Sequence, residues 1–334
     1  MLTVTSLMLR MYHDQSSFYH LLLSIKEFYE LASIPNQVQD GTERFPSSVK
    51  PGEGVSVRFE NVSFRYPGSD SFALKNVNFD IKAGGLCVIV GMNGEGKSSI
   101  LKLLPRLFDP TEGTIYLDNL PINRYRLLDL RKSLNVLFQD FQTFPMTIKE
   151  GIRLGSNTIE YEDEQVREAL KLGGAEGFVN ELPMKEDTNL SHLRQYFSFS
   201  GPEANDIFYA IPEDIRLSSK DTRTNLSGGQ KQRLALSRTF MRKPEEVSLL
   251  VYDEPSAALD PQAEFDLFER LRVLKGNKTM IFSTHRFGYL TRYADIILFM
   301  KDSTIAEAGT HQELMSIPDG GYAKLYTLQA QAFS

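Results

Sequence analysis

The chain is poor in cysteine, and Cys87 is the only one among 334 residues. A single cysteine excludes an internal disulfide framework and a metal site built from several thiolates. Because Cys87 stands inside the apolar run 86–90, we expect it to be a small buried hydrophobic side chain.

The sequence also lacks long apolar runs and an excess of basic residues. No run approaches the roughly 18–20 apolar residues that cross a bilayer, and residues 1–10 show neither the basic start nor the cleavage pattern of a signal peptide. The formal net charge of −6 argues against a general nucleic-acid binder, because such proteins are usually basic. With 24% charged and 41% hydrophobic residues, we expect a globular protein that is soluble or peripheral to a membrane.

Residues 1–54 differ in pattern from the rest of the chain. Apolar side chains recur there at helical intervals until Pro35, so we expect an amphipathic helix, and one interpretation is a helix packed on the domain behind it. Residues 36–54 are rich in Pro, Ser, Gly and charge, which is typical of a linker. The apolar positions of the helix are Phe18, Leu21, Leu22, Ile25, Phe28, Tyr29 and Ala32.

The next part of the chain favours β-structure. Residues 55–64 and 73–81 alternate between apolar and polar side chains, as half-buried strands do. Residues 115–122 have the pattern of a hairpin with its turn at Asp118-Asn119. These segments predict an antiparallel β subdomain.

Strand and helix patterns then alternate, with one interruption. Residues 140–234 are mostly polar and compatible with helices, and the irregular part at 190–220 is expected to be a surface insertion. The alternation resumes from 249 to 300. The order of elements predicts an α/β fold, with a mostly parallel core sheet, the antiparallel β subdomain and a helical subdomain in a domain at 55–330.

The segment 91–98 has the spacing G-x-x-x-x-G-K-S between an apolar run and a helical pattern. A strand, a glycine loop and a helix in this order form a phosphate cradle, because backbone N–H groups turn inward and the helix start adds the positive end of its dipole. We expect Lys97 to reach the β- and γ-phosphates and the Ser98 hydroxyl to hold Mg²⁺. The alternative is a chance glycine turn between a strand and a helix.

The apolar run 249–252 ends in two acids, Asp253 and Glu254. Ligands of a parallel α/β sheet lie at the carboxyl ends of its strands, and two carboxylates at a buried strand end are costly unless a cation or a reaction uses them. Asp253 suits a Mg²⁺ partner, and Glu254 suits the polarisation of the water that attacks a γ-phosphate. The alternative is a strand that simply reaches solvent in acidic residues.

Two further strand patterns end in polar residues with possible roles at such a site. Gln139 follows the short run 136–138, and its amide can ligate Mg²⁺ and orient water without adding charge. His285 follows an apolar strand that begins at Thr279, and it can donate a hydrogen bond to a γ-phosphate oxygen. The alternatives are a surface glutamine at a strand edge and a structural histidine.

The segment 226–230 reads L-S-G-G-Q and precedes a helical pattern at 231–241. Ser227 with two glycines at a helix start is a second anion-binding arrangement, which one nucleotide does not need, so we expect it to contact the nucleotide of a second subunit. The alternative is an ordinary serine N-cap. Upstream, Tyr66 lies in a turn where its ring can stack on adenine, and the alternative there is a tyrosine that faces the core.

Taken together, these motifs resemble the nucleotide-binding domain of ATP-binding cassette (ABC) proteins, over roughly residues 56–330. In that resemblance Tyr66 is the A-loop, 91–99 is Walker A, Gln139 is the Q-loop, 226–230 is the signature, 249–254 is Walker B, 257–260 is the D-loop and His285 is the H-loop. It implies a P-loop ATPase that uses ATP and Mg²⁺, with Glu254, His285, Gln139 and Lys97 as catalytic residues and Ser98, Gln139 and Asp253 at the metal. The implied nucleotide contacts are Tyr66, Gly91, Asn93, Gly94, Gly96, Lys97, Ser98, Ser99, Ser227, Gly228, Gly229 and Gln230.

Further stretches at 139–141, 309–314 and 322–326 look like those of exporter half-transporters, and the helix at 18–32 is similar to the end of a last transmembrane helix. The resemblance therefore implies a second nucleotide-binding domain as partner, in a homo- or heterodimer, and the transmembrane domain of an exporter. It places the chain at the cytoplasmic face of a membrane, with 1–54 as the remnant of a membrane domain and without nucleic acid as a partner.

The sequence departs from the family pattern in three places. The D-loop has Ala257 where a serine is usual, the interval from Gln139 to Leu226 is long, and 218–225 lack the X-loop pattern of exporters. None of these departures removes a group needed for hydrolysis. Two alternatives remain open, namely a non-transport ABC ATPase that acts on ribosomes or DNA, and a truncated product that binds ATP without transport.

Overall fold

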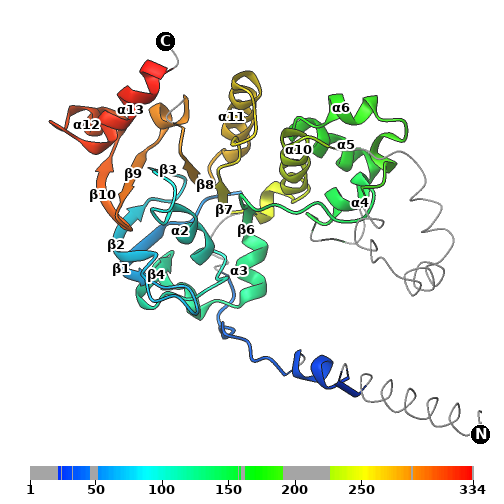
Figure 1. Cartoon of the computed structure of the whole chain (residues 1–334), viewed down its shortest axis with the longest axis horizontal. Coiled ribbons are helices and arrows are strands. Elements are labelled where there is room, and N and C mark those ends of the chain that lie inside the picture. Colours follow the sequence, from blue (N-terminus) through cyan, green and yellow to red (C-terminus); the bar gives the residue numbers. More distant parts are fainter. Residues whose placement is uncertain are drawn as a thin grey trace, which may run out of the picture. The chain divides into compact units, whose positions relative to one another are not determined.

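The computed structural model describes residues 22–23, 25–31, 33–45, 52–156, 158, 162–190, 226–286 and 289–332. The chain divides into two compact units, residues 1–39 and 40–334. In the first unit, residues 22–23 and 25–31 are helical, within the helix expected at 18–32, whereas Phe18, Leu21 and Ala32 lie outside the described residues. All further elements belong to the second unit (Figure 1).

Four strands form an antiparallel sheet in the order β2-β1-β4-β5. They are β1 (Val57–Phe64), β2 (Leu74–Ile81), β4 (Glu112–Leu117) and β5 (Leu120–Pro121). The turn between β4 and β5 is Asp118-Asn119, whose φ angles of 46° and 66° are the left-handed values that a two-residue hairpin turn needs. The predicted hairpin is confirmed.

The second sheet has six strands in the order β10-β9-β3-β8-β7-β6, and all neighbours except β10 and β9 pair in parallel. The predicted mostly parallel sheet is therefore confirmed. The strands are β3 (Leu86–Gly91), β6 (Leu134–Leu137), β7 (Leu249–Asp253), β8 (Thr279–Thr284), β9 (Ile296–Lys301) and β10 (Thr304–Gly309).

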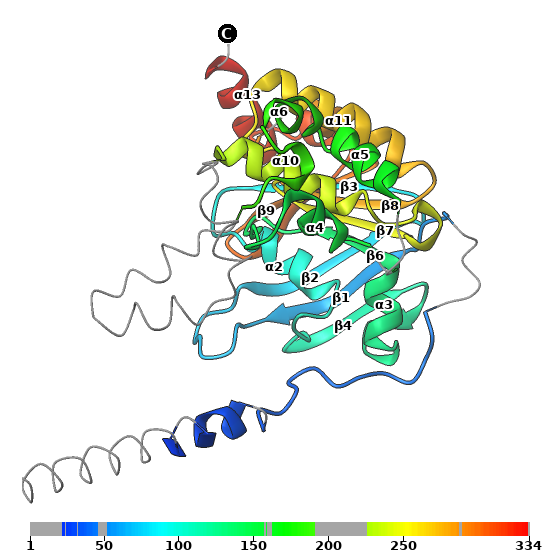
Figure 2. The ribbon, with the colours of Figure 1, turned by 90° about the vertical axis from the view of Figure 1, so that its right-hand side faces the viewer.

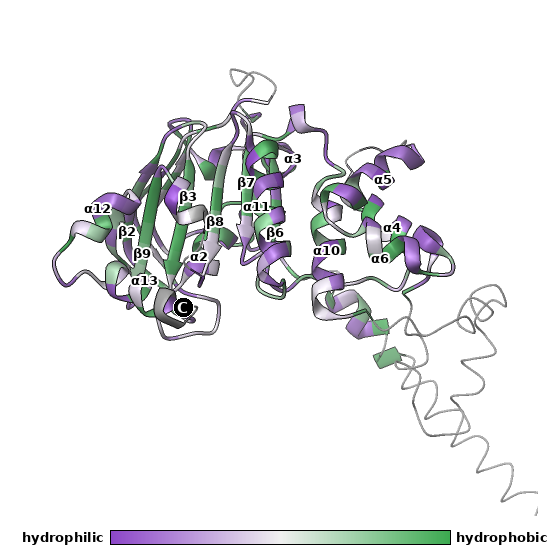
Figure 3. Cartoon of the chain, turned by 90° about the horizontal axis from the view of Figure 1, so that it is seen from above, coloured by the Kyte–Doolittle hydropathy of each residue, from purple (hydrophilic) through white to green (hydrophobic). Residues whose placement is uncertain are grey.

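The parallel strands are apolar on both faces because each face carries its own core. In β7, Leu249 and Val251 join a cluster with the antiparallel sheet and α2 (Lys97–Leu103), while Leu250 and Tyr252 join a cluster with α11 (Pro261–Lys275). Figure 2 shows this layering, with α2 between the two sheets and α11 beyond the parallel one. Such double burial explains why β3 and β9 are strongly hydrophobic in Figure 3.

A third apolar cluster joins α4 (Ile148–Arg153), α5 (Asp163–Leu172), α6 (Glu176–Glu181) and α10 (Gly228–Thr239). These helices lie together beyond β6 and β7 in Figure 1 and Figure 3. Apart from its first residue, the insertion expected at 190–220 lies outside the described residues, and so do 218–225. The remaining helices are α3 (Leu127–Ser133), α12 (His311–Ser316), α13 (Gly321–Ala332), η1 (Ile122–Arg124), η2 (Lys185–Asp187), η3 (Pro244–Glu246) and η4 (Tyr289–Tyr293).

Candidate active site

The loop between β3 and α2 has a backbone that requires its glycines. Gly91, Gly94 and Gly96 all have positive φ, at 155°, 88° and 97°. A Cβ at Gly91 would stand 2.7 Å from Met300 O, and one at Gly96 would stand 2.4 Å from Ala73 O. At Gly94 nothing lies within 4 Å, so only the backbone angle constrains that position. The loop is thus held against its surroundings at both ends and open at its centre.

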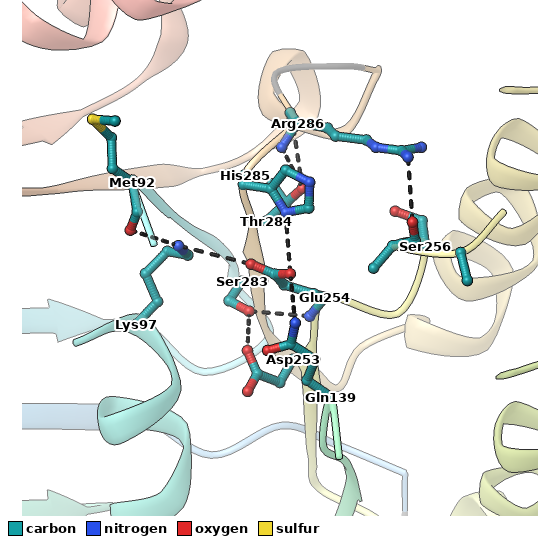
Figure 4. Close-up of polar contacts among 12 residues, drawn as sticks. Met92, Lys97, Gln139, Asp253, Glu254, Ser256, Ser283, Thr284, His285 and Arg286 are labelled. Carbon is teal, nitrogen blue, oxygen red and sulfur yellow. Dashed lines mark hydrogen bonds and ion pairs between the residues drawn. The ribbon is translucent and has the colours of Figure 1, made fainter. Parts of the chain in front are cut away.

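Lys97 at the start of α2 is buried and points back toward this loop. Its Nζ donates to Gly91 O at 2.9 Å and to Met92 O at 3.0 Å, and it lies 3.7 Å from Glu254 Oε1 (Figure 4). Burial lowers the pKa of Lys97, although the charges of Glu254 and Asp253 oppose that shift. The cation therefore stands between the loop carbonyls and the acids at the end of β7.

Asp253 is the last residue of β7 and is only 2% exposed. Its Oδ1 accepts a hydrogen bond from Ser283 Oγ on β8, and the nearby Ser98 hydroxyl also favours the charged form of the carboxyl. Burial raises the pKa of Asp253 in spite of these hydrogen bonds and of the nearby Lys97. The neighbouring strands β7 and β8 thus bring a carboxylate and two hydroxyls together below the loop.

Glu254 is the centre of the site. Its φ of 48° is uncommon for a residue other than glycine, and its N–H is held by the carbonyl and the hydroxyl of Ser283, both at 3.1 Å. Gln139 Nε2 donates to Oε2 at 3.2 Å, His285 Nδ1 lies 3.1 Å from the same oxygen, and Lys97 faces Oε1. Figure 4 shows these side chains converging on one carboxylate from separate elements.

Tyr66 lies beside the end of the loop. Its hydroxyl is 3.0 Å from Ser99 Oγ, and its ring packs edge-on against Phe64 and Phe108. The ring is partly buried, and Asn93 in the loop is exposed. The structure therefore brings together Tyr66 and the loop residues that the sequence singled out.

The segment at the start of α10 is not part of this cluster. Ser227 and Gln230 cap the helix reciprocally, since Ser227 Oγ accepts from Gln230 N at 3.2 Å and Gln230 Oε1 accepts from Ser227 N at 2.8 Å. Gly228 and Gly229 start the helix, and a Cβ at Gly229 would stand 2.9 Å from Ala258 O. Among the described residues, no hydrogen bond or ion pair joins this segment to the loop between β3 and α2, and α10 lies beyond β6 and β7 from α2 (Figure 1).

Several residues at the site were missed in the sequence. Ser283 contacts both acids, and Gln232 on α10 donates to the backbone carbonyl of Glu254. Arg286 Nη1 lies 3.2 Å from Glu264 Oε2, while Ser256 Oγ donates to the other oxygen of that carboxylate at 2.7 Å. For Ser283 a signal existed, because it stands in the polar strand end that also holds His285. Arg286 directly follows His285 and shares that signal. Gln232, Ser256 and Glu264 depend on contacts between separate segments and had no local signal.

The donor atoms here fit a magnesium ion. A hydroxyl, a carboxylate and an amide oxygen, from Ser98, Asp253 and Gln139, are hard oxygen ligands, and the Ser98 hydroxyl is near enough to Asp253 to lower its pKa. No group of three His, Cys, Asp or Glu side chains gathers into a metal site within the part of the chain that the structure describes.

Fold and site together define a P-loop ATPase domain. The ABC transporter family model matches residues 74–257, more than half of the chain, and the chain belongs to this family. Membership implies the binding and hydrolysis of ATP, and the chain is an ABC transporter ATPase domain. The family resemblance and the fold class predicted from the sequence are both confirmed.

The chain is 32% identical, over 301 residues, to provisionally named multidrug export ATP-binding/permease proteins from Staphylococcus aureus strains NCTC 8325 and COL. That match spans 90% of this chain and 45% of each relative. The structure of a bacterial Atm1-family ABC exporter with ATP bound superposes with a TM-score of 0.73 at 30% identity, covering 92% of this chain and 47% of that one. The chain thus spans about half the length of these proteins. Among the residues described, each helix is too short or too polar to cross a membrane.

Proposed function

We propose that this domain hydrolyses ATP in a Mg²⁺-dependent reaction in which Glu254 orients and polarises the attacking water. The observation that carries the proposal is the convergence of Gln139, His285 and Lys97 on the Glu254 carboxylate. A carboxylate fixed in this way, next to a phosphate-binding loop, is suited to accept hydrogen bonds from a water in line with a γ-phosphate.

The roles of the other residues follow from their places. The backbone of Gly91, Gly94 and Gly96 would cradle the phosphates together with Asn93 and Ser99, and Tyr66 would stack on adenine. The Lys97 ammonium would leave the loop carbonyls for the β- and γ-phosphates, and His285 would donate to a γ-phosphate oxygen. Ser98, Asp253 and Gln139 would hold Mg²⁺, which supplies charge neutralisation on the phosphate oxygens.

We further propose that the working form is a head-to-tail dimer, either of two identical or of two different chains. Ser227, Gly228, Gly229 and Gln230 form an exposed or partly exposed helix start that is separate from the loop of their own chain. In the partner's site this helix start would meet the γ-phosphate with backbone N–H groups and the positive end of the α10 dipole.

The third part of the proposal is that the dimer drives export through a transmembrane domain, at the cytoplasmic face of a membrane. In this view residues 55–330 form the nucleotide-binding domain, with a helical subdomain at 140–234, and 1–54 are the end of a membrane domain. A groove of about 470 Å³ between β6 and α10 supports this part of the proposal, because a segment of the transmembrane domain could bind in it. Phe141, Phe144 and Arg238 line it, so it suits a segment with apolar and acidic side chains.

The substitution Glu254→Gln tests the hydrolytic role. The variant keeps the shape of the side chain but removes the charge that polarises water, so we expect turnover to fall by about 10³-fold while ATP still binds. Steady-state phosphate release and equilibrium binding of a fluorescent ATP analogue measure the two quantities. Turnover at the wild-type rate would remove Glu254 from its role, and loss of ATP binding would show that it acts earlier.

A further inference from the structure

We infer that Gln232 is a positioning residue, which couples the helix start at Ser227 to Glu254 within one chain. The inference rests on the proposed function of Glu254. In this inference Gln232 does not contact the nucleotide. It hydrogen-bonds to the backbone that positions the Glu254 carboxylate.

The amide of Gln232 is buried, and both its nitrogen and its oxygen form hydrogen bonds. The residue is 2% exposed, its Nε2 donates to Glu254 O at 3.2 Å, and its Oε1 accepts from Ala258 N at 2.9 Å. A backbone carbonyl can only accept and a backbone N–H can only donate, so one amide orientation satisfies both partners. Gln232 therefore spans the five residues from Glu254 to Ala258.

The backbone conformation of Glu254 needs hydrogen bonds of this kind to stabilise it. Its left-handed φ is a strained conformation that persists only where the surroundings determine it. Ser283 on β8 fixes the N–H of Glu254, and the turn hydrogen bond from Ala257 N, at 3.1 Å, reaches the carbonyl. Gln232 adds a side-chain hydrogen bond to that carbonyl, and it comes from α10 rather than from the sheet.

The same helix carries the segment proposed to bind the partner's nucleotide. Gln232 stands little more than one turn from the capping residue Ser227, and an α-helix transmits a shift of its start as a nearly rigid body. Gly229 also lies close to this turn, since a Cβ there would stand 2.9 Å from Ala258 O. A ligand that engages Ser227 would thus set the position of Glu254 in the same chain, and so link the two sites of a dimer.

The test compares Gln232→Met with Gln262→Met in the 334-residue chain. Methionine keeps the length of the side chain and removes both hydrogen bonds, whereas Gln262 is an exposed residue on α11 that bonds only its neighbour Asp266 among the contacts described. We expect Gln232→Met to lower kcat by about tenfold or more with the Kd for ATP within about twofold of wild type. Gln262→Met should match wild type in both.

A double substitution separates positioning from a merely structural role. If Gln232 acts through Glu254, the loss caused by Gln232→Met should largely disappear in a Glu254→Gln background, measured as single-turnover hydrolysis of radiolabelled ATP. If the two losses multiply, the inference is wrong. Should Gln232→Met not fold, as judged by thermal unfolding, Gln232→Leu also removes both hydrogen bonds with a more compact side chain, and the same result is expected.

The ATPase measurements distinguish an error in this inference from an error in the proposed function. A wild-type chain without ATPase activity contradicts the proposed function. Wild-type activity with an unchanged kcat in Gln232→Met contradicts only the role of Gln232, as does a parallel loss of ATP binding and turnover.

Discussion

At the scale of single residues, Asp253 shows how the site opposes stability. Burial raises its pKa, and the hydrogen bonds from Ser283 and Ser98 do not offset the loss of water. A carboxyl whose pKa is higher in the folded than in the unfolded state makes the folded protein less stable as the pH rises through the folded-state value. The negative charge of Asp253 is therefore a cost to the folded domain wherever the carboxyl is ionised.

The substitution Asp253→Asn removes that charge with little change in shape. We expect the melting temperature at pH 7 to rise by about 2 °C or more, as roughly 1 kcal/mol produces in a large domain, while ATP turnover is lost. Because the wild-type carboxyl is neutral in both states at low pH, the difference should narrow as the pH falls toward the unfolded-state pKa of about 3.9. Calorimetry across this pH range measures the difference in melting temperature between the variant and the wild type. A lower melting temperature of the variant at pH 7 would contradict the claim that the charge of Asp253 destabilises the folded domain.

Two glycines of the loop differ in what constrains them. Gly96→Ala would place a Cβ 2.4 Å from Ala73 O, whereas Gly94→Ala meets nothing within 4 Å and only the strain of a positive φ remains. We expect Gly94→Ala to cost about 1–2 kcal/mol of unfolding free energy and Gly96→Ala to cost clearly more. Denaturant unfolding of the two variants is the measurement. Equal costs would show that the backbone shifts freely at Gly96.

At the scale of elements, the C-terminal helix α13 reaches the site from a distance in sequence. Gln329 Nε2 donates to His285 O at 2.6 Å, directly after β8. The helix is anchored by a second contact, because His311 Nδ1 lies 2.7 Å from the hydroxyl of the buried Tyr322. The position of His285 thus depends partly on an element outside the sheet.

Removing that contact should affect turnover more than binding. For Gln329→Ala we expect a two- to tenfold lower kcat, on the order expected for one hydrogen bond, with ATP affinity almost unchanged. Leu328→Ala, at the exposed neighbouring position, serves as the control. Steady-state ATPase assays measure both, and a loss of the same size in the control would assign the effect to α13 as a whole.

Local patterns predicted some elements well and others only approximately. The hairpin at Asp118-Asn119 is confirmed because the turn needs left-handed residues and both are suited to it. The helix expected at 231–241 begins earlier, at Gly228, since the capping box of Ser227 and Gln230 stabilises a start that two glycines disfavour. The strand before Gln139 is Leu134–Leu137 rather than 136–138, a shift that pairing with β7 decides.

At the scale of the whole molecule, the proposed site is divided between two chains. The helix start at Ser227 and the loop that contains Lys97 are separate in one chain, so each chain would contribute half of two sites. A chain with Lys97→Ala should bind ATP poorly, and a chain with Ser227→Arg should fail to complete the partner's site. Each variant alone is expected to be inactive.

A mixture of the two variants tests this division. Mixed dimers would hold one site with an intact loop from one chain and an intact helix start from the other, so at most about a quarter of the wild-type activity is expected at equal concentrations. The value falls below a quarter if Ser227 sets the position of Glu254 in its own chain, because the intact site uses the Glu254 of the Ser227→Arg chain. ATPase activity as a function of mixing ratio is the measurement. A mixture no more active than the separate variants would contradict the composite site, and activity in either variant alone would contradict the role of its residue.

The sequence alone determined which groups are present and what local backbone they adopt. The glycine loop, the capped helix start and the apolar strands depend on residues within a few positions of one another, so their patterns can be read directly. Only the tertiary structure decided that Gln139, Lys97 and His285 meet at Glu254, because the strand order β3-β8-β7-β6 places distant segments side by side. The hold of Gln232 on Glu254 is of the same kind, since a hydrogen bond between an amide and a backbone carbonyl 22 residues away has no local pattern.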